Sequence, residues 1–273
     1  MTTSEKLIAL SKIISKIIKK PDSIFMVLRD ETEYKELLEK KYHKTQFPTI
    51  DIQYFLESRK QEINHYTFLE GGSWVTDLAL LKSVAARFEA CEYLEIGTWR
   101  GESIANVADV KESQCISVNL SPEQIIERGF PEKYAHEHGC LIRDRENIKT
   151  YYADSLKFDF SSLRKKFDLI FVDGDHTYHA VKSDTQNVFK LLKDDSSIII
   201  WHDYGFDPVT PRHSVIAAIL DGLPTEEHKH LYHVSNTLCA IYTKDANVLN
   251  FIENNPYSAN KTFKINIESK VFE

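Results

Sequence analysis

The sequence predicts an α/β fold: a doubly wound, mostly parallel sheet of about seven strands with an N-terminal helical extension. Short apolar runs alternate with segments of helical period, which is typical of a parallel sheet covered on both faces. Two further runs, at 231–234 and 237–243, leave no room for a helix between them and predict an antiparallel hairpin at the sheet edge. The preceding runs predict strands at 91–97, 115–120, 148–153, 167–173 and 197–203.

Length and composition indicate a compact globule. The chain has 273 residues, of which 42% are hydrophobic and 11% aromatic. A chain of this size can bury roughly three-quarters of the surface that it exposes when unfolded, which favours one large core with an appendage. The 34 Lys and Arg residues against 41 Asp and Glu give a net charge of −7. Because this charge does not attract phosphate backbones, we expect no nucleic acid partner.

The cysteines and the apolar stretches indicate the cellular compartment in which the protein is expected. The four cysteines form no CxxC pair, and three of them lie in or beside apolar runs, where a thiol packs as a small hydrophobe. No apolar stretch approaches the ~20 residues that cross a bilayer, and the first residues lack a secretory core and cleavage site. We therefore expect a cytoplasmic protein without a membrane span. The cysteines are Cys91, Cys115, Cys140 and Cys239.

The N-terminal region predicts a basic amphipathic helix over residues 5–19, which Pro21 ends. Such a helix could lie on a membrane surface or against a partner, but packing on the main domain or across a homodimer is the commoner role. With the aromatic and charged residues that follow, it predicts a helical cap or dimerisation extension over 1–70. The main domain is expected at 71–245 and a C-terminal extension at 246–273.

The main domain begins with an expected amphipathic helix, introduced by Gly71, on which apolar residues recur at alternating spacings of four and three. Its apolar positions are Trp74, Leu78, Leu81, Ala85 and Phe88. The histidines near the hairpin, His228, His230 and His233, resemble a metal tract in composition but are read as solvated surface.

Polar residues end or follow each of the five parallel strands. Ligands of an open parallel sheet bind beyond the carboxyl ends of its strands, so these residues predict the site. The turn after the first strand has Gly97 and Gly101 but no GxGxxG, which argues against a dinucleotide and suits a ligand with an amine and a ribose. The strand-terminal residues are Glu95, Asn119, Asp154, Ser155, Asp173, Asp175, His176, His202 and Asp203.

These segments resemble the class I S-adenosylmethionine-dependent methyltransferases, and among them the small-molecule and sugar O-methyltransferases with a DGDH segment. The resemblance covers residues 71–243 and is carried by YLEIGTWRGES (93–103), ADS (153–155), FDLIFVDGDHTYHAVKSDTQNVFKLL (167–192) and IIIWHDYG (198–205). It implies a Rossmann-like sheet and S-adenosylmethionine as cofactor.

The resemblance also implies which residues bind the cofactor. Asp154 would meet the adenine amine, and Asp173 would lie beside the sulfonium. The sequence departs from the family pattern at Trp99, where a glycine is widespread, and at Asn119, where an acid usually holds the ribose hydroxyls. The implied cofactor residues are Glu95, Gly97, Thr98, Trp99, Gly101, Ser103, Asn119, Asp154, Ser155 and Asp173.

The acceptor side follows from the same resemblance. Related metal-dependent enzymes hold Mg²⁺ with an Asp after the fourth strand and an acidic pair after the fifth. Asp173 and Asp203 match two of these positions, and His202 replaces an oxygen ligand, so the three would form a site for Mg, Mn, Fe or Zn. The alternative is that His202 and Asp203 pair with each other and with neighbouring loops.

Catalysis at a hydroxyl requires a general base, and the resemblance implies Asp173, His176 and His202 as the catalytic residues. His176 lies three residues after Asp173 and is the first base candidate, because histidine titrates near neutral pH. His202 is its competitor. Either histidine could instead bond a loop carbonyl.

The predicted function is S-adenosylmethionine-dependent methyl transfer to a hydroxyl of a small molecule, such as a sugar or glycan intermediate. An inactive cofactor-binding or assembly protein is one alternative. A nicotinamide-dependent oxidoreductase is another, disfavoured by the missing GxGxxG and the lack of a suitably placed Tyr-x-x-x-Lys. The polar set Asp173, His176, His202 and Asp203 favours an enzyme, since a binding relic needs only the pocket residues.

Overall fold

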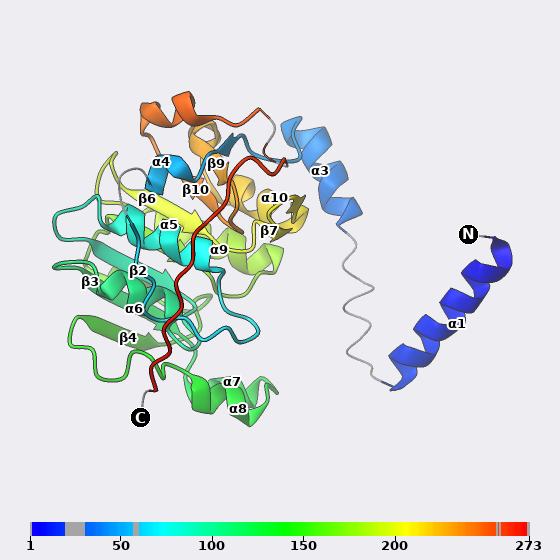
Figure 1. Cartoon of the computed structure of the whole chain (residues 1–273), viewed down its shortest axis with the longest axis horizontal. Helices are drawn as coiled ribbons and strands as arrows, with labels where there is room; N and C mark the ends of the chain where they lie inside the picture. Colours follow the sequence, from blue (N-terminus) through cyan, green and yellow to red (C-terminus); the bar gives the residue numbers. More distant parts are fainter. Residues whose placement is uncertain (1, 20–30, 57–59, 255, 257, 272–273) are drawn as a thin grey trace. The chain divides into compact units, whose positions relative to one another are not determined.

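The computed structural model describes residues 2–19, 31–56, 60–254, 256 and 258–271. The chain divides into two compact units, Met1–Thr45 and Gln46–Glu273. The described part of the first unit contains helices α1 (Thr3–Lys19) and α3 (Thr32–Tyr42) (Figure 1). The predicted N-terminal helix is present as α1, while Pro21, which was expected to end it, lies outside the described residues.

The second unit is built on an eight-stranded sheet in the order β1-β9-β10-β6-β5-β2-β3-β4 (Figure 1). From β6 to β4 all neighbours are parallel, and β10 runs antiparallel to both β6 and β9. The doubly wound, mostly parallel sheet is therefore confirmed. Its strands are β1 (Thr49–Ile50), β2 (Glu92–Ile96), β3 (Gln114–Asn119), β4 (Ile148–Tyr152), β5 (Leu169–Val172), β6 (Ile198–Trp201), β9 (Leu231–Val234) and β10 (Ala240–Tyr242).

The edge of the sheet differs from the expectation. The β9–β10 hairpin was expected there, but β1 pairs with β9 in parallel register, Thr49 opposite His233, and forms an eighth strand. A two-residue strand is too short to produce a periodic signal in the sequence. Residues 46–70 thus belong to the same compact unit as the sheet. A cap or dimerisation role for residues 1–70 stays a prediction.

Helices cover both faces of the sheet (Figure 1). On one face α4 (Gln53–Leu56), α5 (Val75–Ala85) and α6 (Glu102–Ala108) enclose the main core. On the other lie α9 (Tyr178–Phe189) and α10 (His213–Gly222), which pack on each other. Ile200 belongs to the first layer, whereas the indole nitrogen of Trp201 donates to Thr185 of α9 at 2.9 Å. This alternation along β6 is that of a strand buried on both faces.

Shorter elements complete the second unit. They are α7 (Pro122–Glu127), α8 (Glu132–Glu137), η2 (Phe160–Leu163), β7 (Gly205–Asp207), β8 (Thr210–Pro211), η3 (Thr225–His230) and η4 (Ala246–Phe251). Cys91, Cys115 and Cys239 are buried free thiols, as expected for three of the four cysteines. Nowhere in the described residues is a helix both long and apolar enough to cross a bilayer.

Two of the histidines read as solvated are in fact buried. His228 is 8% exposed, and its Nε2 lies 2.9 Å from the Leu220 carbonyl oxygen. His233 is 4% exposed and stacks on Tyr204 with ring centroids 4.8 Å apart. The surface interpretation was wrong for both, because His228 lies against the end of α10 and His233 is on β9, which β1 covers.

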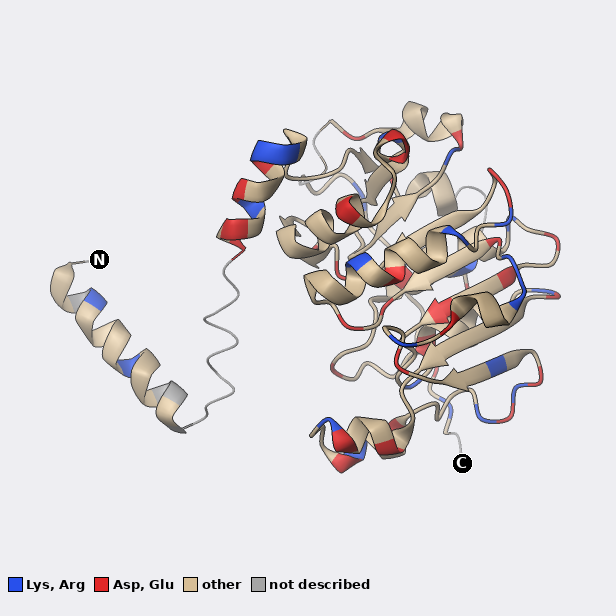
Figure 2. Ribbon diagram, turned by 180° about the vertical axis from the view of Figure 1, so that it is seen from behind, with Lys and Arg blue, Asp and Glu red and all other residues tan. Residues whose placement is uncertain are grey.

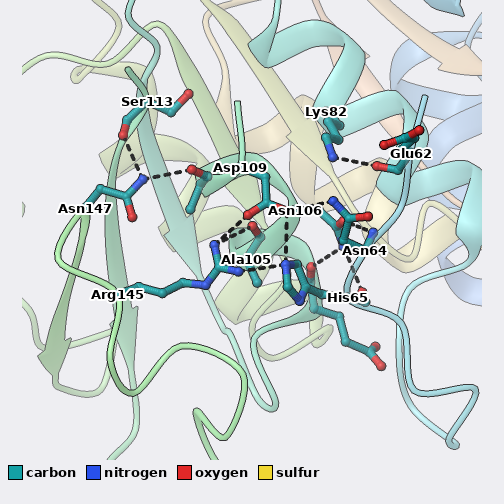
Figure 3. A network of polar contacts seen from close by, with 12 residues as sticks. Glu62, Asn64, His65, Lys82, Ala105, Asn106, Asp109, Ser113, Arg145 and Asn147 are labelled. Carbon is teal, nitrogen blue, oxygen red and sulfur yellow. Dashed lines mark hydrogen bonds and ion pairs between the residues drawn. The ribbon is translucent and has the colours of Figure 1, made fainter. Parts of the chain in front are cut away.

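Polar contacts anchor the irregular segment 60–69 to α6 and to the loop before β4 (Figure 3). The Asn106 side chain donates to the His65 carbonyl oxygen at 2.8 Å. Arg145 donates to Asp109 at 2.8 Å and to Nε2 of His65 at 2.7 Å. These contacts fix the chain just before it reaches the carboxyl end of the sheet.

Candidate functional site

Parallel register brings the ends of β2, β5 and β6 to one level. Ile96 pairs with Val172, and Val172 pairs with Trp201, so the loops that follow these three strands start side by side. The ends of β3 and β4 extend the same rim, because Asn119 pairs with Tyr152. The predicted site residues at the rim are Glu95, Gly97, Asn119, Asp154, Asp173, His202 and Asp203.

Gly97 marks the closest approach of two of these loops. Its φ is +81°, and a Cβ there would lie 2.2 Å from the carbonyl oxygen of Asp173. Only glycine tolerates both the left-handed backbone and this contact. Gly101, with φ +95°, begins α6, and a Cβ on it would lie 2.7 Å from Ile142. The tight turn predicted after the first strand is thus a point of backbone contact between β2 and β5.

Trp99 occupies the position of the widespread glycine and keeps a left-handed backbone, with φ +42°. Arg100 stacks on its ring at 4.7 Å, and Tyr134 packs edge-on at 4.9 Å. Gly71 lies against the same ring, where an added Cβ would come within 2.3 Å. These contacts offset the backbone strain of a left-handed tryptophan.

Glu95 carries a fully buried carboxyl group at the end of β2. Its Oε2 accepts a hydrogen bond from the Tyr93 hydroxyl at 2.6 Å, while Oε1 has no partner among the described residues. Burial raises the pKa of Glu95 to about 8, against the opposing effect of the Tyr93, Ser103 and Thr98 hydroxyls. A buried acid with an unpaired oxygen is costly unless a ligand donates to it, so the site suits an amine.

The residues expected at the ribose and adenine already have protein partners. The Asn119 amide lies 2.9 Å from Nε2 of His138, and burial lowers the pKa of His138, in keeping with a neutral ring that accepts this bond. Asp154 accepts from Arg128 at 2.8 Å. Asn119 lines a hollow of about 470 Å³ and Asp154 one of about 740 Å³. Both side chains therefore border open space beside the rim.

Two further predicted cofactor residues, Thr98 and Ser155, lie beside other polar groups of the protein. The Thr98 hydroxyl shares a hydrogen bond with Ser117 at 2.6 Å. Asp184 of α9 is a fully buried residue that sequence analysis missed, and neither of its carboxylate oxygens has a hydrogen-bond partner among the described residues. Burial raises the pKa of Asp184 to about 7, an effect that the Ser155 hydroxyl opposes. The sequence did contain a signal of this burial, because Asp184 falls between Val181 and Val188 on the apolar stripe of the helix.

His202 lies among three carboxylates on the acceptor side of the rim, that is, at the loops that follow β5 and β6. Its Nδ1 is 3.0 Å from Asp173 and 3.7 Å from Asp203, and its Nε2 is 3.3 Å from Asp77. Burial alone would lower the pKa of His202, but the carboxylates, led by Asp173, hold that pKa well above its usual value. The ring is therefore a protonated bridge at neutral pH, with both nitrogens donating.

Asp77 was also missed from the sequence. It is fully buried near the start of α5, where it accepts from the Trp74 amide at 2.7 Å and from the Leu238 amide at 2.8 Å. One carboxylate thus ties α5, the β9–β10 turn and His202 together. An Asp in the first turn of a helix is usually a solvated favourable charge, so only the fold reveals this role.

Asp203 and His176 form a second pair on the acceptor side. His176 Nδ1 lies 2.9 Å from Asp203, and the histidine side chain is 39% exposed. Burial would raise the pKa of Asp203, but hydrogen bonds from His176 and His202 hold it well below its usual range. The Asp203 backbone is left-handed, with φ +54°, a strain that is common at functional sites. An Nδ1–H that donates to Asp203 leaves Nε2 of His176 as a proton acceptor.

The same residues could hold a cation. Ligand atoms of Asp173, His176 and Asp203 all lie within 4.8 Å of one another. Two carboxylates and an imidazole are donors that suit Mn, Fe or Zn. This set has His176 where the sequence-based set has His202, because both nitrogens of His202 already face carboxylates. The set with His202 stays a prediction.

The family comparison bears directly on this rim. Residues 94–204 match the family model described as "Methyltransferase domain". This stretch of the chain is similar to methyltransferase domains. The matched segment contains Glu95, Asp173, His176, His202 and Asp203. The match confirms the resemblance to methyltransferases over residues 94–204, a stretch that runs from β2 to β6 of the sheet.

Solved structures of methyltransferases are similar to the chain at low identity. An O-methyltransferase from Bacillus cereus, in complex with SAH, is 16% identical, with a TM-score of 0.44 over 63% of this chain and 82% of that one. The SAH-bound Podospora anserina methyltransferase PaMTH1 is 17% identical, with a TM-score of 0.46 over 70% and 93%. CalS11, a TDP-rhamnose 3'-O-methyltransferase in calicheamicin biosynthesis, is 14% identical, with a TM-score of 0.47 over 62% and 79%. None of the curated proteins compared matches the chain. At such scores the likeness carries no conclusion about the acceptor.

The buried Glu95 predicts an unusual dependence of stability on pH. Glu95 holds its proton up to about pH 8 in the folded state and loses it near 4.5 when unfolded, so between these values the folded state binds more protons. The free energy of unfolding should therefore fall as pH rises through this window, by up to about 1.4 kcal/mol per unit. Urea denaturation of the wild type and Glu95→Gln at several pH values measures the effect.

Glu95→Gln cannot ionise and should flatten this part of the profile. The exposed Glu146→Gln serves as the matched control and should leave it unchanged. Parallel profiles for the wild type and Glu95→Gln would show that Glu95 ionises normally in the folded state.

Proposed function

We propose that the chain transfers a methyl group from S-adenosylmethionine to a hydroxyl of a small molecule, such as a sugar or glycan intermediate. One observation carries the proposal: a buried, unpaired Glu95 oxygen and an Asp203–His176 pair lie on the same rim of the sheet. The first suits an amine ligand, and the second can accept a hydroxyl proton.

The residues of the rim fit the donor. When bound, S-adenosylmethionine supplies an electrophilic methyl group on a sulfonium. Glu95 Oε1 would accept from its amine, and Gly97 keeps the β2 turn clear of a side chain. Asn119 and Asp154, beside their open hollows, would face the ribose and the adenine. Asp173 would lie near the sulfonium.

His176 is the better base. A base must be unprotonated, and the carboxylates around His202 keep that ring protonated. His176 is partly exposed, and Asp203 orients its ring and would stabilise the imidazolium that forms when Nε2 takes a proton. His202 acts instead as a positioning residue, because its positive charge between Asp173 and Asp203 offsets their repulsion.

A bound divalent cation is the second arrangement that the geometry favours. When bound, it would lower the pKa of a coordinated acceptor hydroxyl. His176 would then be a ligand with Asp173 and Asp203, so it could not also be the base. A cytoplasmic location, a homodimer through the N-terminal region and the absence of nucleic acid partners remain predictions.

Binding of the cofactor product should release a proton. Because Glu95 is protonated in the free protein at pH 7, an ammonium partner should drive its ionisation. Calorimetric titration with S-adenosylhomocysteine in buffers of different ionisation enthalpy measures the released proton. Glu95→Gln should lose the release and about 1.5–3 kcal/mol of binding free energy.

The control for this titration is Glu146→Gln, an exposed residue that borders neither hollow. It should keep both the affinity and the proton release. An unchanged proton count and affinity in Glu95→Gln would remove Glu95 from the ligand site.

The rate of methyl transfer distinguishes His176 as a general base from His176 as a ligand of a divalent cation. His176→Ala should lower the rate of methyl transfer to a hydroxyl acceptor by about 10²–10⁴ while binding S-adenosylhomocysteine normally. His179→Ala, at an exposed histidine of α9, which begins two residues after His176, is the matched control and should stay active. Labelled donor and a panel of sugars and phenols provide the assay, with melting temperatures to report folding.

The outcomes of this assay are distinct. Full activity after exhaustive chelation would exclude the cation, and loss restored by Mn²⁺ would assign His176 to it as a ligand. Full turnover of His176→Ala would exclude both roles for His176. Absence of transfer by the wild type, with normal cofactor binding, would favour the assembly protein.

A further inference from the structure

Within its own unit, Met1–Thr45, helix α1 leaves a large apolar surface uncovered. Six of its described aliphatic side chains are each between 41% and 75% exposed: Leu7, Ile8, Leu10, Ile13, Ile14 and Ile18. Five of them, all but Ile8, fall within one half of the helix circumference. Lys12 is about 160° from Leu10 around the axis, whereas Lys6 falls within the apolar half, about 40° from Leu10. A contiguous apolar face of this kind marks an interaction surface.

The charge of this region is opposite in sign to that of the chain. Residues 1–20 contain five lysines and one glutamate, a net charge of +4 in a chain whose total is −7. Figure 2 shows blue and no red among the described residues of α1, whereas α3 carries both colours. An anionic partner therefore complements α1 in both its charge and its apolar face.

Two other occupants fit less well. A coiled coil needs about three to four heptads, and the 17 residues of α1 span little more than two. Two copies would also bring together four lysines from each helix against a single glutamate from each, too few acidic partners to set coiled-coil pairing. A membrane span is excluded among the described residues, since none of their helices has the required length and apolarity.

We propose that α1 lies in the surface of a bilayer rich in anionic lipid. Its apolar side chains would enter the boundary between headgroups and acyl chains, and its lysines would contact the phosphate and carboxylate groups. The helix would tether the methyltransferase domain to the membrane surface, where a lipid-linked or membrane-derived acceptor would be within reach. The tether itself does not depend on the proposed function.

The test is co-sedimentation of the full chain with vesicles. We expect binding to an equimolar mixture of phosphatidylcholine and phosphatidylserine and at least about tenfold weaker binding to phosphatidylcholine alone. Binding should fall when salt rises from 0.1 M to 1 M, because the Debye length shrinks from about 10 Å to about 3 Å. Leu10→Asp/Ile14→Asp should abolish it, and Lys6→Glu/Lys12→Glu should weaken it at least about tenfold.

Matched controls carry the same changes elsewhere. Lys40→Glu/Lys41→Glu reverses two charges on α3, and Leu249→Asp places an acid at an exposed leucine of η4. Both should bind like the wild type. Equal binding by Leu10→Asp/Ile14→Asp, or no binding of the wild type to anionic vesicles, would overturn the proposal. Dissociation of a wild-type dimer by Leu10→Asp/Ile14→Asp, seen by light scattering without vesicle binding, would assign the face to a second copy.

Discussion

The site depends on the parallel register of β2, β5 and β6. Because Ile96, Val172 and Trp201 are level, the loops that begin at Gly97, Asp173 and His202 share one rim. A slip of one residue in any strand would turn its side chains to the opposite face and break this alignment. Gly97 secures the register locally, since it lets the Asp173 carbonyl approach to a distance that no side chain permits. Donor and acceptor groups can therefore meet at one edge.

Two buried acids give the rim its electrostatic character. Glu95 is held neutral by burial, which leaves an oxygen that a cationic ligand would pair. Asp77, in contrast to Glu95, has a protein partner for each of its oxygens: it accepts hydrogen bonds from two backbone amides and helps to keep His202 protonated. The donor half therefore accepts positive charge, while the acceptor half already holds a cation among its carboxylates. This separation suits a reaction between a sulfonium and a hydroxyl.

The sequence predicted most of the sheet and the rim, because apolar runs and the polar residues after them are local signals. All five parallel strands appear as expected. The hairpin also forms, but inside the sheet rather than at its edge. It did not predict β1, whose two residues gain their structure from pairing with β9. Nor did it reveal Asp77, since a first-turn Asp looks solvated until the β9–β10 turn covers it. The group of possible cation ligands with His176 could not be found from spacing, which placed His202 at the rim, because only the contacts show that both nitrogens of His202 are engaged.

The central claim is that the unpaired oxygen of Glu95 receives the amine of the methyl donor at the rim formed by β2, β5 and β6. A crystal structure with S-adenosylhomocysteine tests it most directly. We expect the ligand amine within hydrogen-bonding distance of Glu95 Oε1 and the sulfur on the side of Asp173 and His176. A ligand bound away from these strand ends, or a Glu95 oxygen still without a partner in the complex, would contradict the account.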